Sequence, residues 1–562
     1  MRQPRLARRA ISLCFVFALI AGLGFQAWAQ AAPSAAVDDK TGVGPVSGSG
    51  SGPGSIPASG PGHGRILLVL PFDNRSGQPS LEWIREAAPE ILSSRFLSAG
   101  FAPMSRADRL YALDHLGLPA GFHPSRATAL KLAQTLDADS IVVGSYLTDG
   151  SGIIAEAQVV DVPHLRISKT VTAHGEMKDM IEVFDSLAWE LTRQLDPGFS
   201  VAEETFVAAG KGLRVDAFEQ YVRGISESDH AERLRHLNQT VSLNPAFGPA
   251  WMALGREDYN SQQYEQAAAA FAHVGPNDPD ALEAGFYRGL SLLFSGDYAK
   301  AEQSFAALSR VLPLAEVINN NAVAVSRQKH DATALFRQAV AADANTADYH
   351  FNLAVSLKRH GETAEALTEL ATCLRLRPND SEAQALEEEW KTPAGAQAAD
   401  AEAKADPLER IARNFDAVAF RQAAQMLDQV DEARLTALPP EQRSRKLAAQ
   451  ANDYLDKGLL LEAERIYQSA LAIDDRVPEV HAGLAEVRER SGDAADARKE
   501  ARTSLELMPT VQAYLVMGRL DLDAGHFDEA SYHVEQALKI EAGNKPALQL
   551  QQQIRTRKEQ KK

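Results

Sequence analysis

The chain has 562 residues, of which 45% are apolar and 24% charged, a balance typical of a folded protein with several domains. Its 75 acidic residues exceed its 58 basic residues and give a net charge of −17 at pH 7. Because nucleic-acid binding depends on clustered basic side chains, this charge argues against nucleic acid as a partner. Ala, Leu, Glu, Gln and Arg are frequent and only 7% of residues are aromatic, which favours a mainly α-helical fold.

Residues 1–29 have the order of a secretory signal peptide. Basic residues are concentrated in residues 2–9, an apolar stretch follows from Ile11 to Phe25, and the small-x-small sequence Ala-Trp-Ala ends at Ala29. We therefore expect a periplasmic or secreted protein that is cleaved after Ala29. The apolar stretch is nearly long enough to span a membrane, so an uncleaved anchor is the alternative. No later segment is long and apolar enough to be a span.

Residues 30–64 are rich in Gly, Ser and Pro and carry few charges, a composition that predicts a flexible linker. The two cysteines are Cys14, in the leader, and Cys373, so the mature chain can form no internal disulfide. We interpret Cys373 as a small apolar residue of the core rather than a metal ligand or redox group.

A small α/β domain is predicted for residues 65–198. The continuous apolar run Ile66–Leu70 is typical of a strand buried on both faces, and Ser140–Tyr146 has the same character. Further strands are predicted at 152–160 and 165–174, and helices at 81–97, 105–116, 125–136 and 177–195.

Two stretches of this domain, LLVLPFDNRSGQPS and DADSIVVGSYLTDGSGIIAEAQVVD, resemble the TolB amino-terminal-like (FlgO/CsgG-related) domain. The resemblance implies a non-enzymatic module associated with the bacterial envelope or with sensors, and VPHLRISKT departs from the family's Gly-containing turn. Asp73, Asn74 and Arg75 follow the first strand, where open α/β sheets often bind ligands. The alternative is that these side chains only cap their own turn.

Most of the remaining chain carries a pattern with a period of about 34 residues. Within each period, a bulky residue, Leu and Gly lie on one predicted helix, and Ala and an aromatic residue or Leu lie on the next. The positions that carry the pattern are Trp251, Leu254, Gly255, Ala267, Phe271, Gly289, Ala301, Phe305, Leu353, Ala354, Ala366, Ala463, Tyr467, Leu484, Ala497, Gly518 and Ala530.

This pattern resembles the tetratricopeptide repeat (TPR) family. The resemblance implies pairs of antiparallel helices, which approach closely at the small residues and stack into a solenoid with one continuous core. It places a first array at residues 213–392 and a second at residues 441–545. The expected fold is therefore mainly α, a solenoid in two arrays preceded by the small α/β domain.

Residues 393–440 are predicted to contain an Ala-rich linker and then a long helix over residues 408–435. Apolar residues recur there at helical spacing, and Asp406-Pro407 has the composition of a helix start. Residues 546–562 are predicted to form a terminal capping helix with a polar, basic tail.

The sequence contains no cluster of Cys or His at metal-binding spacing, no nucleophile elbow and no phosphate-binding loop. We therefore expect no enzymatic activity, no cofactor and no metal. The preferred function is an exported scaffold that binds other proteins in the concave groove of the repeats. The alternative is a ligand-sensing or transport-accessory protein, in which the α/β domain binds a small molecule and the repeats relay this to a partner.

Four residues are candidates for partner binding: Asn320, Asn321, Asn352 and Lys358. The first helix of each hairpin lines the concave face of a TPR array, and the repeat pattern places these residues on such helices. An amide both donates and accepts hydrogen bonds, which suits an extended peptide backbone, and Lys358 adds local positive charge. The alternative is that they form ordinary polar helix faces or caps.

Signal cleavage gives the first prediction. Amino-terminal sequencing of protein recovered from the periplasm or medium should begin at Gln30 or within a few residues of it. Recovery of the uncleaved chain from the cytosol would contradict the export hypothesis.

Overall fold

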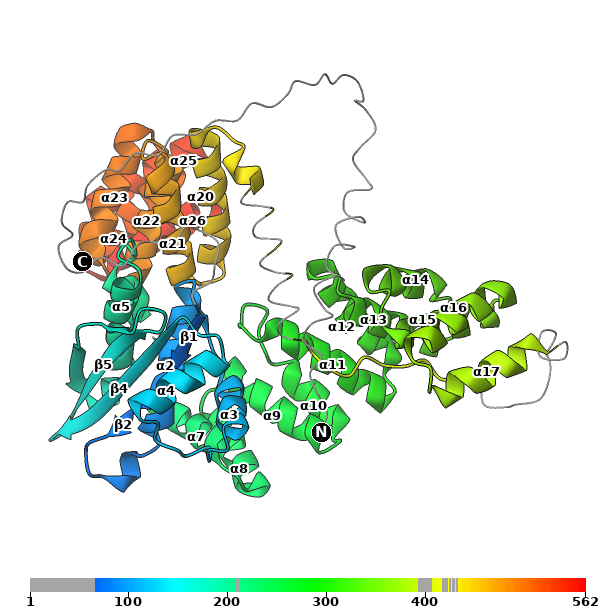
Figure 1. The fold of residues 1–562 in the computed structure, drawn as a ribbon. Helices are drawn as coiled ribbons and strands as arrows, with labels where there is room; N and C mark the ends of the chain where they lie inside the picture. Colours follow the sequence, from blue (N-terminus) through cyan, green and yellow to red (C-terminus); the bar gives the residue numbers. More distant parts are fainter. Residues whose placement is uncertain are drawn as a thin grey trace, which may run out of the picture. The chain divides into compact units, whose positions relative to one another are not determined.

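The computed structural model describes residues 66–208, 210, 212–392, 407–416, 423, 426, 430 and 433–561 (Figure 1). The leader and linker predicted for residues 1–64 lie outside these residues. The chain divides into two compact units, one containing Trp251–Gln425 and the other joining Ser59–Ala250 to Met426–Lys562. A small mixed sheet domain and a TPR-like helical solenoid are both present, which confirms the predicted fold class.

A seven-stranded mixed sheet forms the centre of the α/β domain (Figure 1). β1 is parallel to β3 and β4, whereas the long β5 is antiparallel to β4, β6 and β7. The short β2 continues the parallel pairing with β4. The strands are β1 (Ile66–Val69), β2 (Asp73–Asn74), β3 (Ala102–Pro103), β4 (Ser140–Asp149), β5 (Gly152–Asp161), β6 (Arg166–Ile167) and β7 (Val171–Glu176).

Apolar side chains on the strands explain why helices cover this sheet. Leu68 of β1 and Ile141 of β4 are buried in one cluster with Leu113 and Leu132 of two covering helices, α3 and α4. In β5, buried residues alternate with less buried ones, as expected for a strand with one face on the core, and α5 packs against β5 and β7. The helices of the domain are α2 (Ile84–Ser98), α3 (Arg106–His115), α4 (Arg126–Thr135) and α5 (Met180–Leu195).

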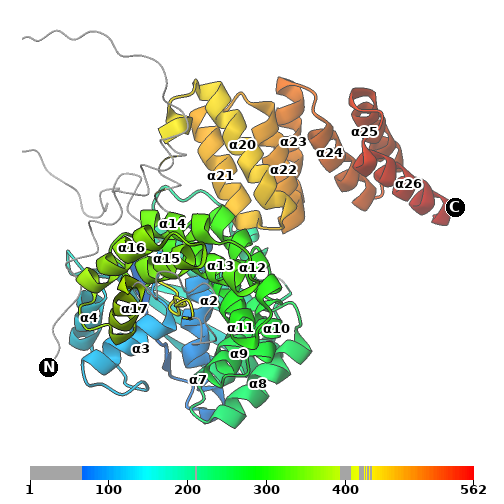
Figure 2. The same ribbon diagram turned by 90° about the vertical axis from the view of Figure 1, so that its right-hand side faces the viewer.

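The same unit contains one helical hairpin, α7–α8, and the second repeat array, whose helices Figure 2 shows as successive hairpins. The short α6 packs on α21 and α22 of this array. There the fully buried Glu464 accepts hydrogen bonds from the backbone N–H of Ala202 (2.9 Å) and from Arg488 (2.7 Å). The helices are α6 (Glu203–Ala208), α7 (Val215–Ser226), α8 (His230–Leu243), α20 (Pro440–Asp456), α21 (Leu460–Ile473), α22 (Pro478–Ser491), α23 (Ala494–Leu507), α24 (Val511–Asp523), α25 (Phe527–Ile540) and α26 (Lys545–Gln560).

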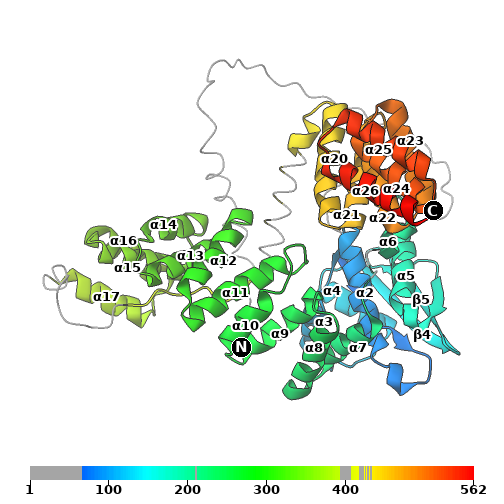
Figure 3. The same ribbon diagram turned by 180° about the vertical axis from the view of Figure 1, so that it is seen from behind.

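The other unit contains the first repeat array, seen from behind in Figure 3. Its helices pack around a cluster of buried apolar residues that extends from Ala268 to Trp390, and after the first helix each one contacts the next along the chain. They are α9 (Gly248–Asn260), α10 (Tyr264–Phe271), α11 (Ala281–Ser295), α12 (Tyr298–Val311), α13 (Ala315–Arg327), α14 (Thr333–Ala342), α15 (Ala347–Arg359), α16 (Thr363–Leu376) and α17 (Ser381–Lys391).

Small residues at the repeat positions let these helices approach closely. A Cβ atom added to Gly289 would lie 2.6 Å from the ring of Phe305, and one added to Gly255 would lie 2.6 Å from the ring of Phe271. Neither pair tolerates a larger residue without displacing a buried ring. Except for Trp251, which is partly exposed and stacks on His273, every residue assigned to the repeat pattern is buried.

The long helix predicted over residues 408–435 is not what the structure contains. Residues 407–416 have no helical structure. Between residues 417 and 436, the described residues 423, 426, 430 and 433–436 are helical. Leu408, Ile411 and Phe415 have helical spacing in the sequence, yet the main chain between them is hydrogen-bonded by side chains of the repeats. Those bonds replace the internal bonds of a helix, so tertiary contacts override the local pattern.

Ala366 on α16 is fully buried, whereas Ala364 on the same helix is exposed. Ala366→Arg should push α16 away from its neighbour and bury a charge, lowering the stability of the first array by about 3 kcal/mol or more. Ala364→Arg is the matched control and should leave thermal unfolding nearly unchanged. Equal melting temperatures for the two variants would contradict the packing described for this hairpin.

Candidate functional site

The most specific arrangement of polar groups in the first array lies where residues Pro407–Asp416, here called the docked segment, run along α13 and α15. Three buried asparagines, the asparagine row, face this segment: Asn319 and Asn320 from α13 and Asn352 from α15. All three have no exposed surface. Buried amides require hydrogen-bond partners, and the backbone of the docked segment supplies them.

Two of the asparagines each bind both polar groups of one backbone residue. Asn352 accepts a hydrogen bond from the N–H of Arg410 (2.6 Å) and donates to its carbonyl oxygen (2.8 Å). Asn320 accepts from the N–H of Ala412 (2.9 Å) and donates to its carbonyl oxygen (2.8 Å). Residues two apart present the same edge in an extended chain, so this pair of contacts selects an extended backbone whatever its side chains are.

Asn319 connects the other two members of the row. Its amide nitrogen donates to the carbonyl oxygen of Arg410 (3.1 Å), and its side-chain oxygen accepts from Asn352 (2.8 Å). Asn319 also donates to the side-chain oxygen of Asn320 (3.3 Å). These bonds agree with the donor and acceptor ends that the backbone contacts assign to each amide, so the three side chains form one network.

The side chain of Glu409 lies in a basic subsite formed by the ends of α13 and α15. It is 4% exposed and accepts from Ser326, Arg359 and the Nε of Arg327, the last at 2.7 Å. Arg359 also donates to the carbonyl oxygen of Pro407 (2.9 Å). Burial opposes ionisation of Glu409, but the hydrogen bonds from Ser326 and Arg359 outweigh it and lower the pKa of the carboxyl.

Arg410, the next residue, lies in an acidic subsite formed by the N-terminal parts of α15 and α17. Its guanidinium donates to Asp380 (2.5 and 2.8 Å), Asp348 (3.0 Å) and Glu382 (2.9 Å). Its central carbon lies 3.6 Å from the ring centroid of Phe351, a cation–π contact. The hydrogen bond from Arg410 is the largest influence on Asp380 and lowers its pKa.

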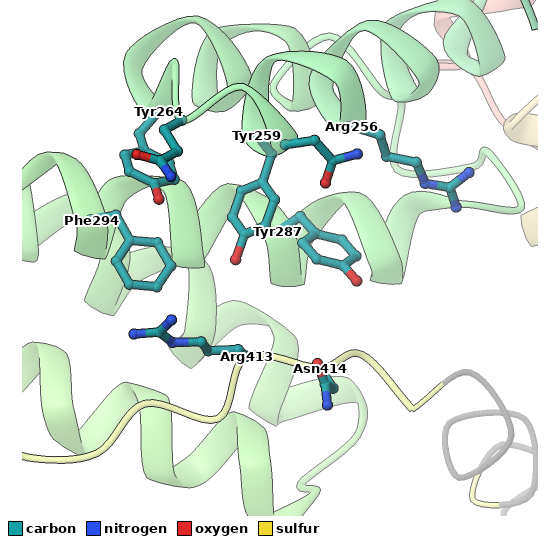
Figure 4. A pocket seen from close by; sticks show the side chains of 9 residues that line it. Arg256, Tyr259, Tyr264, Tyr287, Phe294, Arg413 and Asn414 are labelled. Carbon is teal, nitrogen blue, oxygen red and sulfur yellow. The ribbon is translucent and has the colours of Figure 1, made fainter. Parts of the chain in front are cut away.

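Beyond these subsites the docked segment reaches an aromatic cavity of about 520 Å³ in the same unit. Figure 4 shows Arg413 extending from the segment towards Phe294, whose ring centroid is 5.4 Å from the guanidinium carbon. The ring of Phe415 lies 5.7 Å from that of Phe286. The cavity is lined by Arg256, Tyr259, Asn260, Gln262, Tyr264, Tyr287, Phe294, Arg413 and Asn414.

The four partner-binding candidates from the sequence lie on α13 and α15, the two helices that face the docked segment, but only two of them contact it. Asn320 and Asn352 bind the docked segment directly. Asn321 is 8% exposed, and its side-chain oxygen has no hydrogen-bond partner. Lys358 donates to Thr363 (3.3 Å) and lies over the ring of Trp390 (5.9 Å).

Other residues of the groove were missed, although the sequence carries a signal for them. Asn319 and Asn352 are 33 positions apart, and so are Ser326 and Arg359. Polar residues repeated at nearly the TPR period on first helices are therefore the signal. The acidic subsite has no such repeat, because Asp348 and Asp380 occupy different positions within their helices: Asp348 is inside the first turn of α15, and Asp380 is the N-cap of α17.

The ligand-loop candidates lie in the α/β domain, which belongs to the other unit. Asp73 and Asn74 form β2, and the amide of Asn74 donates to the carbonyl oxygen of Gln78 (3.1 Å) and to Glu82 (3.0 Å). Arg75 is within 3.8 Å of Glu156. Asn74 thus bonds residues that follow it directly in the chain, as the turn-capping alternative expects, and the ligand loop stays a prediction.

Among the described residues, no group of three or more His, Cys, Asp or Glu side chains could hold a metal ion. Cys373 is buried in the core of the first array, and burial raises the pKa of its thiol to about 11. No helix in the described part of the chain is both long and apolar enough to cross a bilayer.

Three stretches of the chain, residues 252–310, 322–381 and 448–510, match a tetratricopeptide-repeat family model. The chain thus contains TPRs in both units, as the sequence pattern predicted. No curated protein matches the chain significantly.

Several solved structures are similar to parts of the chain. The first TPR of Spaghetti (RPAP3) bound to an HSP90 peptide is 22% identical, with 21% of this chain and 93% of that chain covered and a TM-score of 0.19. A TPR protein of Thermus thermophilus is 17% identical, with coverages of 31% and 98% and a TM-score of 0.23. The LpoB C-terminal domain from Escherichia coli is 20% identical, with coverages of 21% and 88% and a TM-score of 0.19.

The lowered pKa values of Glu409 and Asp380 predict a pH dependence. Because the docked state favours the ionised carboxylates, its stabilisation is complete above the ordinary carboxyl pKa of about 4 and is lost as pH falls through the lowered values. Glu409→Gln should therefore lower the melting temperature of the first array at pH 7, and this difference from wild type should shrink below about pH 4. A difference that is constant with pH would rule out an ionised Glu409 in the groove.

Proposed function

We propose that this protein is an exported, non-enzymatic scaffold of the bacterial envelope, whose first repeat array binds an extended segment of a partner protein. The observation that carries the proposal is the asparagine row, which holds Arg410 and Ala412 by both their N–H and C=O groups. A groove that already binds one extended main chain in this way has the chemistry needed to bind another.

Backbone recognition and side-chain recognition are separated in this groove. The asparagine row supplies sequence-independent bonds, and the subsites around Glu409 and Arg410 supply selectivity. This division is the one used by grooves that bind extended peptides, where main-chain bonds give affinity and pockets give specificity.

The second array does not present the same feature in its described residues. There Asn452 accepts from Tyr467 (2.7 Å) and from Gln512 (3.3 Å), and Gln512 also donates to Glu486 (2.8 Å). Asn452, Gln512 and Glu486, on the first helices α20, α24 and α22, are thus linked to one another by hydrogen bonds. This contrast favours the first array as the peptide site.

The envelope location rests on the sequence. The leader in residues 1–29 has the organisation of an export signal, and residues 65–198 resemble a domain found in envelope proteins. A large core without disulfides fits a chain whose one mature thiol, Cys373, is buried.

The test replaces two members of the row. Asn320→Ala with Asn352→Ala removes four backbone hydrogen bonds, each worth about 1 kcal/mol net. The same bonds hold the docked segment, so the pair is introduced into a chain that also carries Glu409→Arg and Arg410→Glu, which weaken that segment. Capture of a partner by the groove should then fall at least tenfold relative to the same chain with both asparagines. The tagged mature chain would be used for affinity capture from the source cell envelope, with quantification by mass spectrometry.

Asn345→Ala with Asn379→Ala is the matched control, because both asparagines are exposed turn residues of the same array. With Glu409→Arg and Arg410→Glu present in all three proteins, partners captured equally by the parent and the control but lost from the Asn320/Asn352 variant are groove ligands. Identical capture by all three proteins would show that the contact surface lies elsewhere.

A further inference from the structure

Four side chains of the docked segment each have a matching subsite in the array. Glu409 meets two arginines and a serine, and Arg410 meets three carboxylates and the face of Phe351. Arg413 lies over Phe294, and Phe415 packs against Phe286. The segment is therefore recognised by its side chains as well as by its backbone.

The two charged subsites have opposite sign and lie next to each other. Arg327 and Arg359 converge on one carboxylate, while Asp348 and Asp380 converge on the next residue's guanidinium. Like charges held close together repel unless a charge of opposite sign lies between them. Ligand selection then depends on order: an acidic residue followed directly by a basic one satisfies both subsites, and the reversed order satisfies neither.

We infer that the first array recognises extended segments with the pattern Glu-Arg-x-x-Arg-x-aromatic, and that the docked segment is a built-in competitor that a partner segment of this pattern displaces. This inference rests on the proposed function, whose partner class and regulation it specifies. The pattern is the sequence of residues 409–415, Glu-Arg-Ile-Ala-Arg-Asn-Phe.

Competition follows from covalent attachment. A ligand tethered to its own binding site acts at a high effective concentration, so it occupies the site most of the time. The apparent dissociation constant of a second ligand rises by the inverse of the fraction of open sites. Weakening the docked segment without altering the groove should therefore tighten the binding of an external peptide.

The experiment uses the full mature chain and a fluorescent synthetic peptide with the sequence of residues 407–416, PLERIARNFD. In the test protein, Glu409→Arg and Arg410→Glu reverse the charge order of the docked segment and leave every groove residue intact. The control peptide, PLREIARNFD, has the same composition with the same reversal. Binding is measured by fluorescence anisotropy.

The charge-reversed protein should bind PLERIARNFD at least tenfold more tightly than wild type does, and should bind PLREIARNFD at least tenfold more weakly than PLERIARNFD. Arg410→Ala, a milder change to the docked segment, should give a smaller gain in affinity for PLERIARNFD. Circular dichroism establishes that each variant is folded.

Three results would overturn the inference. Equal affinity of wild type and both variants for PLERIARNFD means that the docked segment does not compete. Equal affinity of the charge-reversed protein for the two peptides means that charge order is not recognised. A concentration-dependent dimer of wild type that the charge reversal abolishes, detected by light scattering, means that the segment occupies the groove of a second copy.

The proposed function is tested separately by the capture experiment with Asn320→Ala and Asn352→Ala. If capture depends on those asparagines but PLERIARNFD does not bind, the groove binds partners of a different pattern and only this inference fails. If PLERIARNFD binds as expected but capture is unaffected, the competitor mechanism stands and the proposed scaffold function of this groove fails.

Discussion

A main chain that leaves water must have its N–H and C=O groups hydrogen-bonded, and the docked segment meets this requirement through side chains of its neighbours. In helices and sheets, other backbone groups provide these hydrogen bonds. Here Asn320 and Asn352 provide the missing partners, and an amide is the side chain suited to this, because its donor and acceptor lie side by side. The non-helical conformation of residues 407–416 and the polarity of the groove depend on this exchange.

The repeat architecture explains how two asparagines come to be spaced for consecutive contacts on one strand. Stacked hairpins place equivalent positions of α13 and α15 side by side, and Asn319 and Asn352, 33 residues apart, are hydrogen-bonded across that interface. Small residues such as Gly289 hold neighbouring helices close, so the polar faces are presented on a rigid support. The packing of the core and the geometry of the groove are therefore set by the same period.

The solenoid could be predicted from the sequence because its signal is repeated, and each repeat reports on the others. The groove was located less precisely. Asn321 was predicted where Asn319 makes the contact, because the unit around α13 lacks the Leu and Gly landmarks that fix the frame elsewhere. On α15 the prediction named Lys358, whereas the neighbouring Arg359 binds Glu409. The docked segment could not be predicted, since the spacing of Leu408, Ile411 and Phe415 is that of a helix and only contacts distant in sequence overrule it.

Amide hydrogen exchange at Arg410 and Ala412 tests the docking of this segment most directly. Both amides donate to buried asparagines, so in the wild-type chain they should exchange far more slowly than amides of an unstructured peptide. Replacing Asn320 and Asn352 by alanine should bring both to the unstructured rate while the amides within α15 stay protected. Unprotected exchange at Arg410 and Ala412 in the wild-type chain would contradict the docked arrangement.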